Sequence, residues 1–175
     1  MAHITQDAVA RMIAEATLDV FSTMLNLEIT PGEPYVGAQS QVTRSGVTSF
    51  VGLAGSWVGT GAIDCSAEFA CQISSHFLMS DYAAVNEEVL DAVAEVTNMI
   101  IGNVKTKLEE IVGPLGLSIP TVIYGRNFAS RVVGTPEWVI VPFDCSGQRM
   151  EVQMCLAPAE RAHLLRTPAA QPISV

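Results

Sequence analysis

The residues whose types and spacing can do chemistry form a narrow polar stripe on one predicted helix, residues 87–112. At 100° of rotation per residue, four positions fall within about 60° of arc: Asp91, Glu95, Asn98 and Gly102. A carboxylate and a carboxamide one turn apart, beside a position without a side chain, form a surface suited to docking into a cleft. A solvated helix face has the same polar character, so helix geometry alone leaves both interpretations open.

Two residues of the stripe favour a functional role. Asn98 lies in the middle of the predicted helix, where asparagine is a poor helix former. Its side chain cannot cap the helix there, because a cap forms only at a helix end. Gly102 costs roughly 1 kcal/mol relative to alanine in an exposed helix interior. Such residues are typical of positions where another backbone approaches closely or where the amide group itself is needed.

Strong start and stop signals define the helix that carries the stripe. Asn86 is a favourable N-cap, and Glu87 and Glu88 place negative charge in the first turn, where it opposes the helix dipole. Gly113-Pro114 ends the helix. The side opposite the stripe is apolar and predicts a core face: Val89, Val93, Val96, Ile100 and Ile111.

The remaining pattern predicts an α+β fold, with a predominantly antiparallel sheet of about six strands and long helices packed on one face. The expected strands are residues 39–43, 47–53, 57–64, 119–124, 136–143 and 149–156. Two further helices are expected at residues 5–26 and 67–79, the first with its core face on Val9, Met12, Ile13, Ala16, Val20 and Met24. Turns are expected at Arg44-Ser45-Gly46, Gly55-Ser56 and Ser146-Gly147. We expect one domain over residues 1–157 and a loosely structured tail over residues 158–175.

The composition excludes several classes of protein. The chain has 175 residues, of which 49% are apolar and 15% charged, with a net charge of −9. This apolar content excludes a disordered acidic chain. The acidic excess argues against nucleic acid and anionic membrane as partners, because both attract clustered Lys and Arg.

An uncharged run between Arg44 and Asp64 raises the question of a membrane span. The run contains five glycines, which disfavour a helix and suit strands and tight turns. The N-terminus carries Asp7 and lacks the apolar stretch of a signal peptide. We therefore expect no membrane partner and a cytoplasmic location.

The cysteines and histidines predict no metal site. The four cysteines contain no CxxC pair and the three histidines are isolated from one another, whereas zinc requires paired ligands. The simplest interpretation is that the cysteines are buried as small apolar residues, although sequence alone leaves a Cys–His nucleophilic pair open. Gly59-x-Gly61 lies in a predicted strand without a following helix, which argues against a dinucleotide site.

The stripe extends into a recognisable motif. Asp91-x3-Glu95-x2-Asn98, followed 22 positions later by Pro120, resembles the signature of the CheC/CheX/FliY chemotaxis phosphatases, D/S-x3-E-x2-N with a distant proline. The first predicted helix has Glu15 but Leu18 where a second asparagine would stand. The resemblance is therefore to a single-site, CheX-like member of that family.

This resemblance implies a phosphatase that dephosphorylates the aspartyl phosphate of a CheY-like response regulator, in chemotaxis or another two-component pathway. Asn98 would orient the attacking water and Glu95 would pair with a lysine of the regulator. Asp91 and Gly102 would contribute to docking, and Pro120 would be structural. No cofactor is expected on this chain, since the regulator supplies its own Mg²⁺. The alternative is a non-catalytic adaptor that binds a receiver domain without turnover.

The resemblance also implies a homodimer formed through sheet edges. The segment Trp138 to Phe143 is apolar and uncharged, which makes an open strand edge prone to aggregation. Pro142 lacks a backbone N–H, so it limits how far such an edge can pair.

Overall fold

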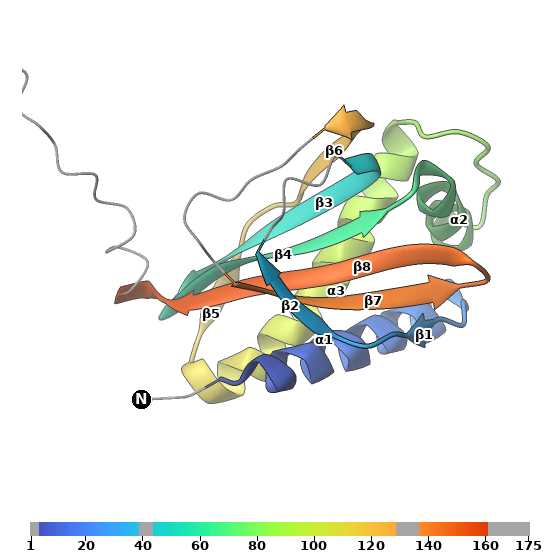
Figure 1. The fold of residues 1–175 in the computed structure, drawn as a ribbon. Helices are drawn as coiled ribbons and strands as arrows, with labels where there is room; N and C mark the ends of the chain where they lie inside the picture. The colour runs from blue at the N-terminus through green and yellow to red at the C-terminus, as the bar shows by residue number, and fades with distance from the viewer. Residues whose placement is uncertain (1–3, 39–43, 129–136, 161–175) are drawn as a thin grey trace, which may run out of the picture.

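An antiparallel sheet with helices on one of its faces forms the architecture (Figure 1). A computed structural model of the chain describes residues 4–38, 44–128 and 137–160. The expected α+β class is confirmed. Residues 39–43, an expected strand, and residues 161–175 of the expected tail lie outside the described residues.

Three long helices form where the sequence predicts them: α1 (Gln6–Val20), α2 (Ala67–Leu78) and α3 (Glu87–Val112). Each begins with a side chain that accepts a hydrogen bond from the first turn. The caps are Thr5, Ser66 and Asn86, and the Asn86 Oδ1 lies 2.9 Å from the amide nitrogen of Val89. Such caps satisfy amides that the helix itself leaves without a partner.

The described part of the sheet has eight strands rather than about six. They are β1 (Thr30–Pro31), β2 (Tyr35–Ala38), β3 (Arg44–Gly55), β4 (Trp57–Cys65), β5 (Leu115–Leu117), β6 (Thr121–Phe128), β7 (Glu137–Cys145) and β8 (Gln148–Pro158). The order is β1-β7-β8-β4-β3-β5, and in addition β2 pairs with β7 and β6 with β3. The short strands β1, β2 and β5 were not expected from the sequence, because two to four residues give no clear alternation.

Two of the three expected turns are confirmed. Gly55-Ser56 joins β3 to β4, and Ser146-Gly147 joins β7 to β8 with positive φ angles of 52° and 85°. The uncharged run therefore forms the β3–β4 hairpin. None of the helices in the described residues is long and apolar enough to cross a membrane.

The third expected turn, Arg44-Ser45-Gly46, is wrong. These residues belong to β3, where the pairing with β6 shifts register between Arg44 and Gly46. A Cβ on Gly46 would lie only 2.2 Å from the carbonyl oxygen of Cys65, and its φ is 132°. The glycine therefore marks an irregularity inside a strand, where backbone approaches backbone closely.

The apolar segment of β7 is not an open edge. One side of β7 pairs with β8, and the other pairs with β1 and β2. Pro142 lies between the stretches that pair with β1 and β2, and its carbonyl accepts a hydrogen bond of 2.8 Å from the Gly32 amide. The unpredicted short strands β1 and β2 thus cover the edge that the sequence marked as prone to aggregation.

The main core lies between the helices and the sheet. Along α3 the predicted core residues are buried, except Ile111, which is 41% exposed near the end of the helix. Met24, expected in the core, is 48% exposed, because residues Phe21–Leu25 form a π-helical turn that changes the rotation per residue. All four cysteines are buried, and burial, with a smaller contribution from nearby Cys71, raises the pKa of Cys65 to about 12.

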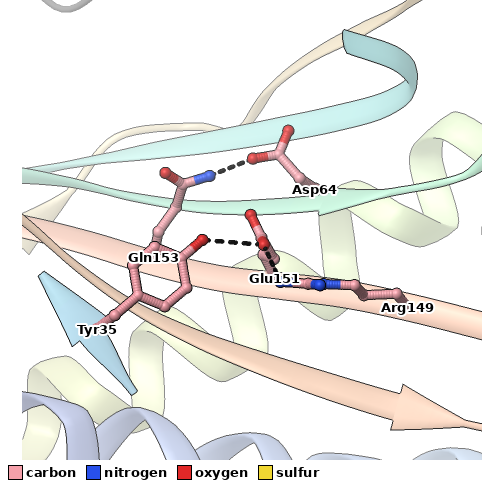
Figure 2. A network of polar contacts seen from close by, with 5 residues as sticks. All are labelled: Tyr35, Asp64, Arg149, Glu151 and Gln153. Atoms are coloured by element: carbon pink, nitrogen blue, oxygen red, sulfur yellow. Dashed lines mark hydrogen bonds and ion pairs between the residues drawn. The ribbon is translucent and has the colours of Figure 1, made fainter. Parts of the chain in front are cut away.

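The other face of the sheet carries a network of polar side chains (Figure 2). The hydroxyl of Tyr35 donates to Glu151 at 3.0 Å, and Arg149 forms an ion pair of 2.9 Å with the same carboxylate. Gln153 donates to Asp64. The members on β4 and β8 alternate with core residues such as Ile63 and Val152, so the network lies on the face away from the helices.

Candidate functional site

The helix α3 is fixed in place from several directions. On one side, Lys107 of α3 forms an ion pair with Glu15 of α1. Near the start of the helix, the Ser74 hydroxyl of α2 donates to the Val89 carbonyl at 3.2 Å. Near its end, the Leu115 amide of β5 donates to the Glu109 carboxylate at 2.8 Å. Side chains on the free face of α3 are therefore presented by a rigid element.

Close packing sets the distance between α3 and the sheet. A Cβ on Gly61 of β4 would lie 2.5 Å from the Cδ1 atom of Ile101. Because glycine leaves this space free, α3 can approach the middle of the sheet. Ile100 and Ile101 are fully buried there, which holds the opposite face of the helix outward.

The stripe predicted from the sequence lies on this outward face. Asp91 and Glu95 are exposed, whereas Asn98 and Gly102 are half-buried. Within the described part of the chain, no hydrogen bond or ion pair engages the side chains of Asp91, Glu95 or Asn98. Their polar groups are therefore available to a binding partner.

Gly102 is not required by the packing of the fold. A Cβ at this position would lie 3.8 Å from Leu117 Cδ1, which is an ordinary van der Waals contact. An alanine would fit and would favour the helix by about 1 kcal/mol. The distance also shows that β5 runs beside α3 at the level of Gly102.

Pro120 lies in a β-bulge of the edge formed by β5 and β6. Leu117 pairs with Leu53, and Thr121 pairs with Phe50, so residues 118–120 oppose only residues 51 and 52 of β3. The Ser118 amide donates to the Gly52 carbonyl, and the Gly52 amide donates to the Ser118 hydroxyl, each at 2.9 Å. Proline is tolerated in such a bulge because its missing N–H breaks no ladder hydrogen bond. Pro120 thus precedes β6 directly, in a bulge rather than in the turn that follows the helix.

The charges around the stripe are predominantly acidic. The carboxylates on the N-terminal half of α3 are those of Glu87, Glu88, Asp91 and Glu95. The two lysines of α3 are both paired, Lys107 with Glu15 and Lys105 with Glu109 at 2.9 Å. The Leu115 amide and, to a smaller extent, Lys105 hold the pKa of Glu109 below its usual value. The face therefore suits a partner that presents a cationic side chain.

The arrangement can orient water and bind an ammonium group, but it offers no metal ligands of its own. Among the described residues, no group of three or more His, Cys, Asp and Glu side chains could hold a metal ion. A carboxamide does not titrate near neutral pH, so Asn98 can position a water molecule without acting as a general base.

One feature of the site was missed by sequence reasoning. Ile119, which the sequence placed in an ordinary strand, lies in the bulge beside α3 and is 86% exposed. An Ile-Pro pair at the start of a strand is a weak signal of such a bulge, since proline is confined to edges and irregular positions of sheets.

Comparisons with known proteins agree with this geometry. A family model described as Chemotaxis phosphatase CheX matches residues 47–144. The "CheY-P phosphatase CheX" of Thermotoga maritima is 27% identical over 129 residues, which cover 71% of this chain and 83% of that protein. The chemotaxis protein CheX of Desulfovibrio desulfuricans superposes with a TM-score of 0.77 at 29% identity, covering 85% of this chain and 99% of the other. A chain of the CheX–CheY–BeF3–Mg²⁺ complex of Borrelia burgdorferi superposes with a TM-score of 0.68 at 31% identity, covering 83% of this chain and 96% of the other.

Proposed function

The chain belongs to the chemotaxis phosphatase CheX family, and from this premise we propose that it hydrolyses the aspartyl phosphate of a CheY-like receiver domain. The observation that carries the proposal is the pair Glu95 and Asn98. Both side chains lie one turn apart on the outward face of α3, without an internal hydrogen bond or ion pair in the described residues. Two of the relatives named above, the CheY-P phosphatase of Thermotoga maritima and the CheX of the Borrelia burgdorferi complex with CheY, support a receiver as the substrate.

Asn98 is the proposed catalytic residue. Its carboxamide would hold a water molecule in line with the phosphorus atom, and Mg²⁺ in the receiver would stabilise the charge of the phosphoryl group. The water oxygen attacks phosphorus, the bond between phosphorus and the aspartyl oxygen breaks, and inorganic phosphate and a free aspartate result. An acyl phosphate is intrinsically labile, so positioning suffices and no strong base is needed.

Glu95 is the proposed contact to the receiver's lysine. Its exposed carboxylate lies one turn before Asn98 on the same face, within reach of an ammonium group at the mouth of the receiver's pocket. Asp91 extends the acidic stripe toward the start of α3 and contributes to docking. Gly102 leaves space on the other side of Asn98, where the partner's backbone can approach closely.

Two finer parts of the proposal concern location and assembly. Action on a receiver domain requires the chain to work in the cytoplasm. We also propose a homodimer through a sheet edge, for which the β1–β2 edge is the candidate in the described residues. Sedimentation at micromolar concentration is expected to give a dimer of the 18.6 kDa chain, and a monomer alone would contradict this assembly.

Phosphate release tests the activity directly. A panel of purified CheY-like receivers is phosphorylated in the presence of Mg²⁺, and the loss of phosphate is followed with and without the chain. We expect accelerated release from at least one receiver. Binding of phosphorylated receivers without acceleration would instead identify the chain as an adaptor, and neither binding nor acceleration would reject the proposed function.

A further inference from the structure

Ile119 is an exposed apolar side chain on a firmly hydrogen-bonded stretch of backbone. It is 86% exposed, although it sits in a sheet whose irregular segment is tightly bonded. The preceding Ser118 exchanges two hydrogen bonds with Gly52 of β3, and its hydroxyl also lies 2.9 Å from the carbonyl oxygen of Ile119. Pro120 restricts the backbone of Ile119 to extended conformations. Because this backbone is already fixed, little backbone entropy is lost when a partner covers the side chain.

Along the axis of α3, Ile119 lies at about the same level as Asn98. The chain reverses at Gly113-Pro114, so β5 and β6 run back along α3 toward its start (Figure 1). Leu117 lies beside Gly102, as the distance of 3.8 Å from its Cδ1 atom to a Cβ at that glycine shows. From Leu117 to Ile119 the chain advances at most about 6.6 Å, because the bulge shortens the rise, and from Gly102 to Asn98 the helix goes back about 6 Å. Ile119 is therefore close to the level of Asn98, in the bulge between β5 and β6.

We propose that Ile119 is an apolar docking contact for the phosphorylated receiver, on the sheet side of the catalytic stripe. The inference rests on the proposed function and adds a contact that the motif does not contain. A receiver that brings its aspartyl phosphate to Asn98 has to cover the neighbouring bulge, because the bulge lies at about the same level as Asn98. The receiver therefore presents an apolar side chain next to its acidic pocket, opposite Ile119.

The charges of the stripe explain why an apolar contact is needed there. Glu95 and Asp91 provide an attraction that is long-ranged, screened by salt and similar for any partner with a cationic patch. A buried aliphatic group adds affinity that depends on shape and is insensitive to salt. Ile119 thus distinguishes a matching receiver from other domains that carry the same lysine and acidic pocket.

The test separates binding from turnover. Binding is measured with the receiver that the wild-type chain dephosphorylates fastest, activated by beryllofluoride and Mg²⁺ so that no hydrolysis occurs. For Ile119→Ser we expect the Kd to rise about tenfold and the KM with it, whereas kcat at saturating receiver stays within twofold of wild type. Ile119→Val should restore most of the affinity. The matched control is Met24→Ser, which removes an exposed apolar side chain at the end of the first helix and should leave the Kd unchanged.

Each outcome has one interpretation. Because Ile119 is exposed, its replacement should leave the thermal unfolding temperature nearly unchanged, which a melting curve verifies. An Ile119→Ser variant that is folded and binds with wild-type Kd overturns the inference while leaving the phosphatase proposal intact. If the wild-type chain neither binds nor dephosphorylates any receiver of the panel, the proposed function fails and the inference fails with it.

Discussion

The helices α1 and α3 are built alike and lie side by side under the same sheet (Figure 1). Both start at a side-chain cap, Thr5 for α1 and Asn86 for α3. Both bury an apolar stripe in the main core, and both carry a glutamate on the outer side, Glu15 in α1 and Glu95 in α3. Architecture alone therefore does not distinguish the two helices.

Their polar faces differ at two points. Three residues after Glu95 comes Asn98, whereas three residues after Glu15 comes Leu18, which is 37% exposed. Lys107 forms an ion pair with Glu15 and holds the pKa of that carboxyl below its usual value, whereas Glu95 has no such partner among the described residues. One helix uses its carboxylate to hold the fold together, and the other leaves its carboxylate available.

The two helices differ in the features that set the proposed binding face of α3 apart from a structural one. The outer face of α1 engages Glu15 within the chain, and this helix contains neither asparagine nor glycine. The face of α3 contains Asn98 and Gly102, both unfavourable in a helix interior, and the carboxylates of Asp91 and Glu95 have no partner within the described residues. The expected effects of substitution therefore differ in kind between the two helices.

Replacing Asn98 should have the largest effect. Asn98→Ala should lower the rate of receiver dephosphorylation by about two orders of magnitude, the scale of losing one preorganised polar group. Its stability and its affinity for a beryllofluoride-activated receiver should change little, because the side chain makes no internal hydrogen bond. Phosphate-release kinetics measure the loss, with Asn103→Ala as a control that removes another half-buried amide from the same helix. Full activity in Asn98→Ala against every cognate receiver would reject the mechanism.

The sequence was sufficient to predict α3 and its stripe, because the signals are local. The N-cap, the acidic first turn, the Gly-Pro stop and the helical period all lie within residues 86–114. The central hairpin and the β7–β8 turn were also predictable from glycine and from strand alternation.

What the sequence did not reveal depends on contacts between distant segments. The covering of β7 by β1 and β2 and the bulge at residues 118–120 arise from pairing in the sheet, which no local pattern encodes. The role of Lys107 depends on a residue 92 positions away. Ile119 was therefore interpreted as an ordinary strand residue, and Glu15 could not be recognised as engaged.

Replacing the two glutamates should separate docking from structure. Glu95→Ala should raise the receiver concentration needed for half-maximal activity by about tenfold, on the scale of a charge-assisted contact, and lower kcat less. Glu15→Ala should leave KM and kcat unchanged. Steady-state kinetics of both variants decide this, and equal effects of the two substitutions on KM would remove the distinction between the helices.

The ion pair of Glu15 also has an expected pH dependence. The usual pKa of this carboxyl is 4.5, and Lys107 lowers it in the folded chain. The pair therefore stabilises the fold above the unfolded pKa, and its contribution is lost as the pH falls through the lowered value. Denaturation of the wild type and of Glu15→Ala should differ at neutral pH and converge in acid. A difference that persists unchanged in acid would contradict this assignment.

Gly102→Ala should change stability and docking in opposite directions. The added methyl group fits against Leu117 and favours the helix, so the free energy of unfolding should rise by about 1 kcal/mol. The same methyl group fills space that we expect the partner's backbone to occupy, so KM for the phosphorylated receiver should rise about threefold. Chemical denaturation and kinetics on the same preparation measure both. A variant that is more stable and has unchanged KM would show that the partner does not approach this position.

The smallest effect is expected from a substitution that gives α1 the Glu-x2-Asn pair of α3. Leu18→Asn places an amide three residues after Glu15, on an exposed position that tolerates it, and we expect activity within twofold of wild type. In the background of Asn98→Ala, the same substitution should restore nothing, because Lys107 keeps the Glu15 carboxylate engaged. Phosphate release by the double variant, compared with Asn98→Ala alone, measures this. Recovered activity would mean that the Glu-x2-Asn pair suffices on either helix, and that neither the ion pair of Glu15 nor the surroundings of α3 decide which face acts.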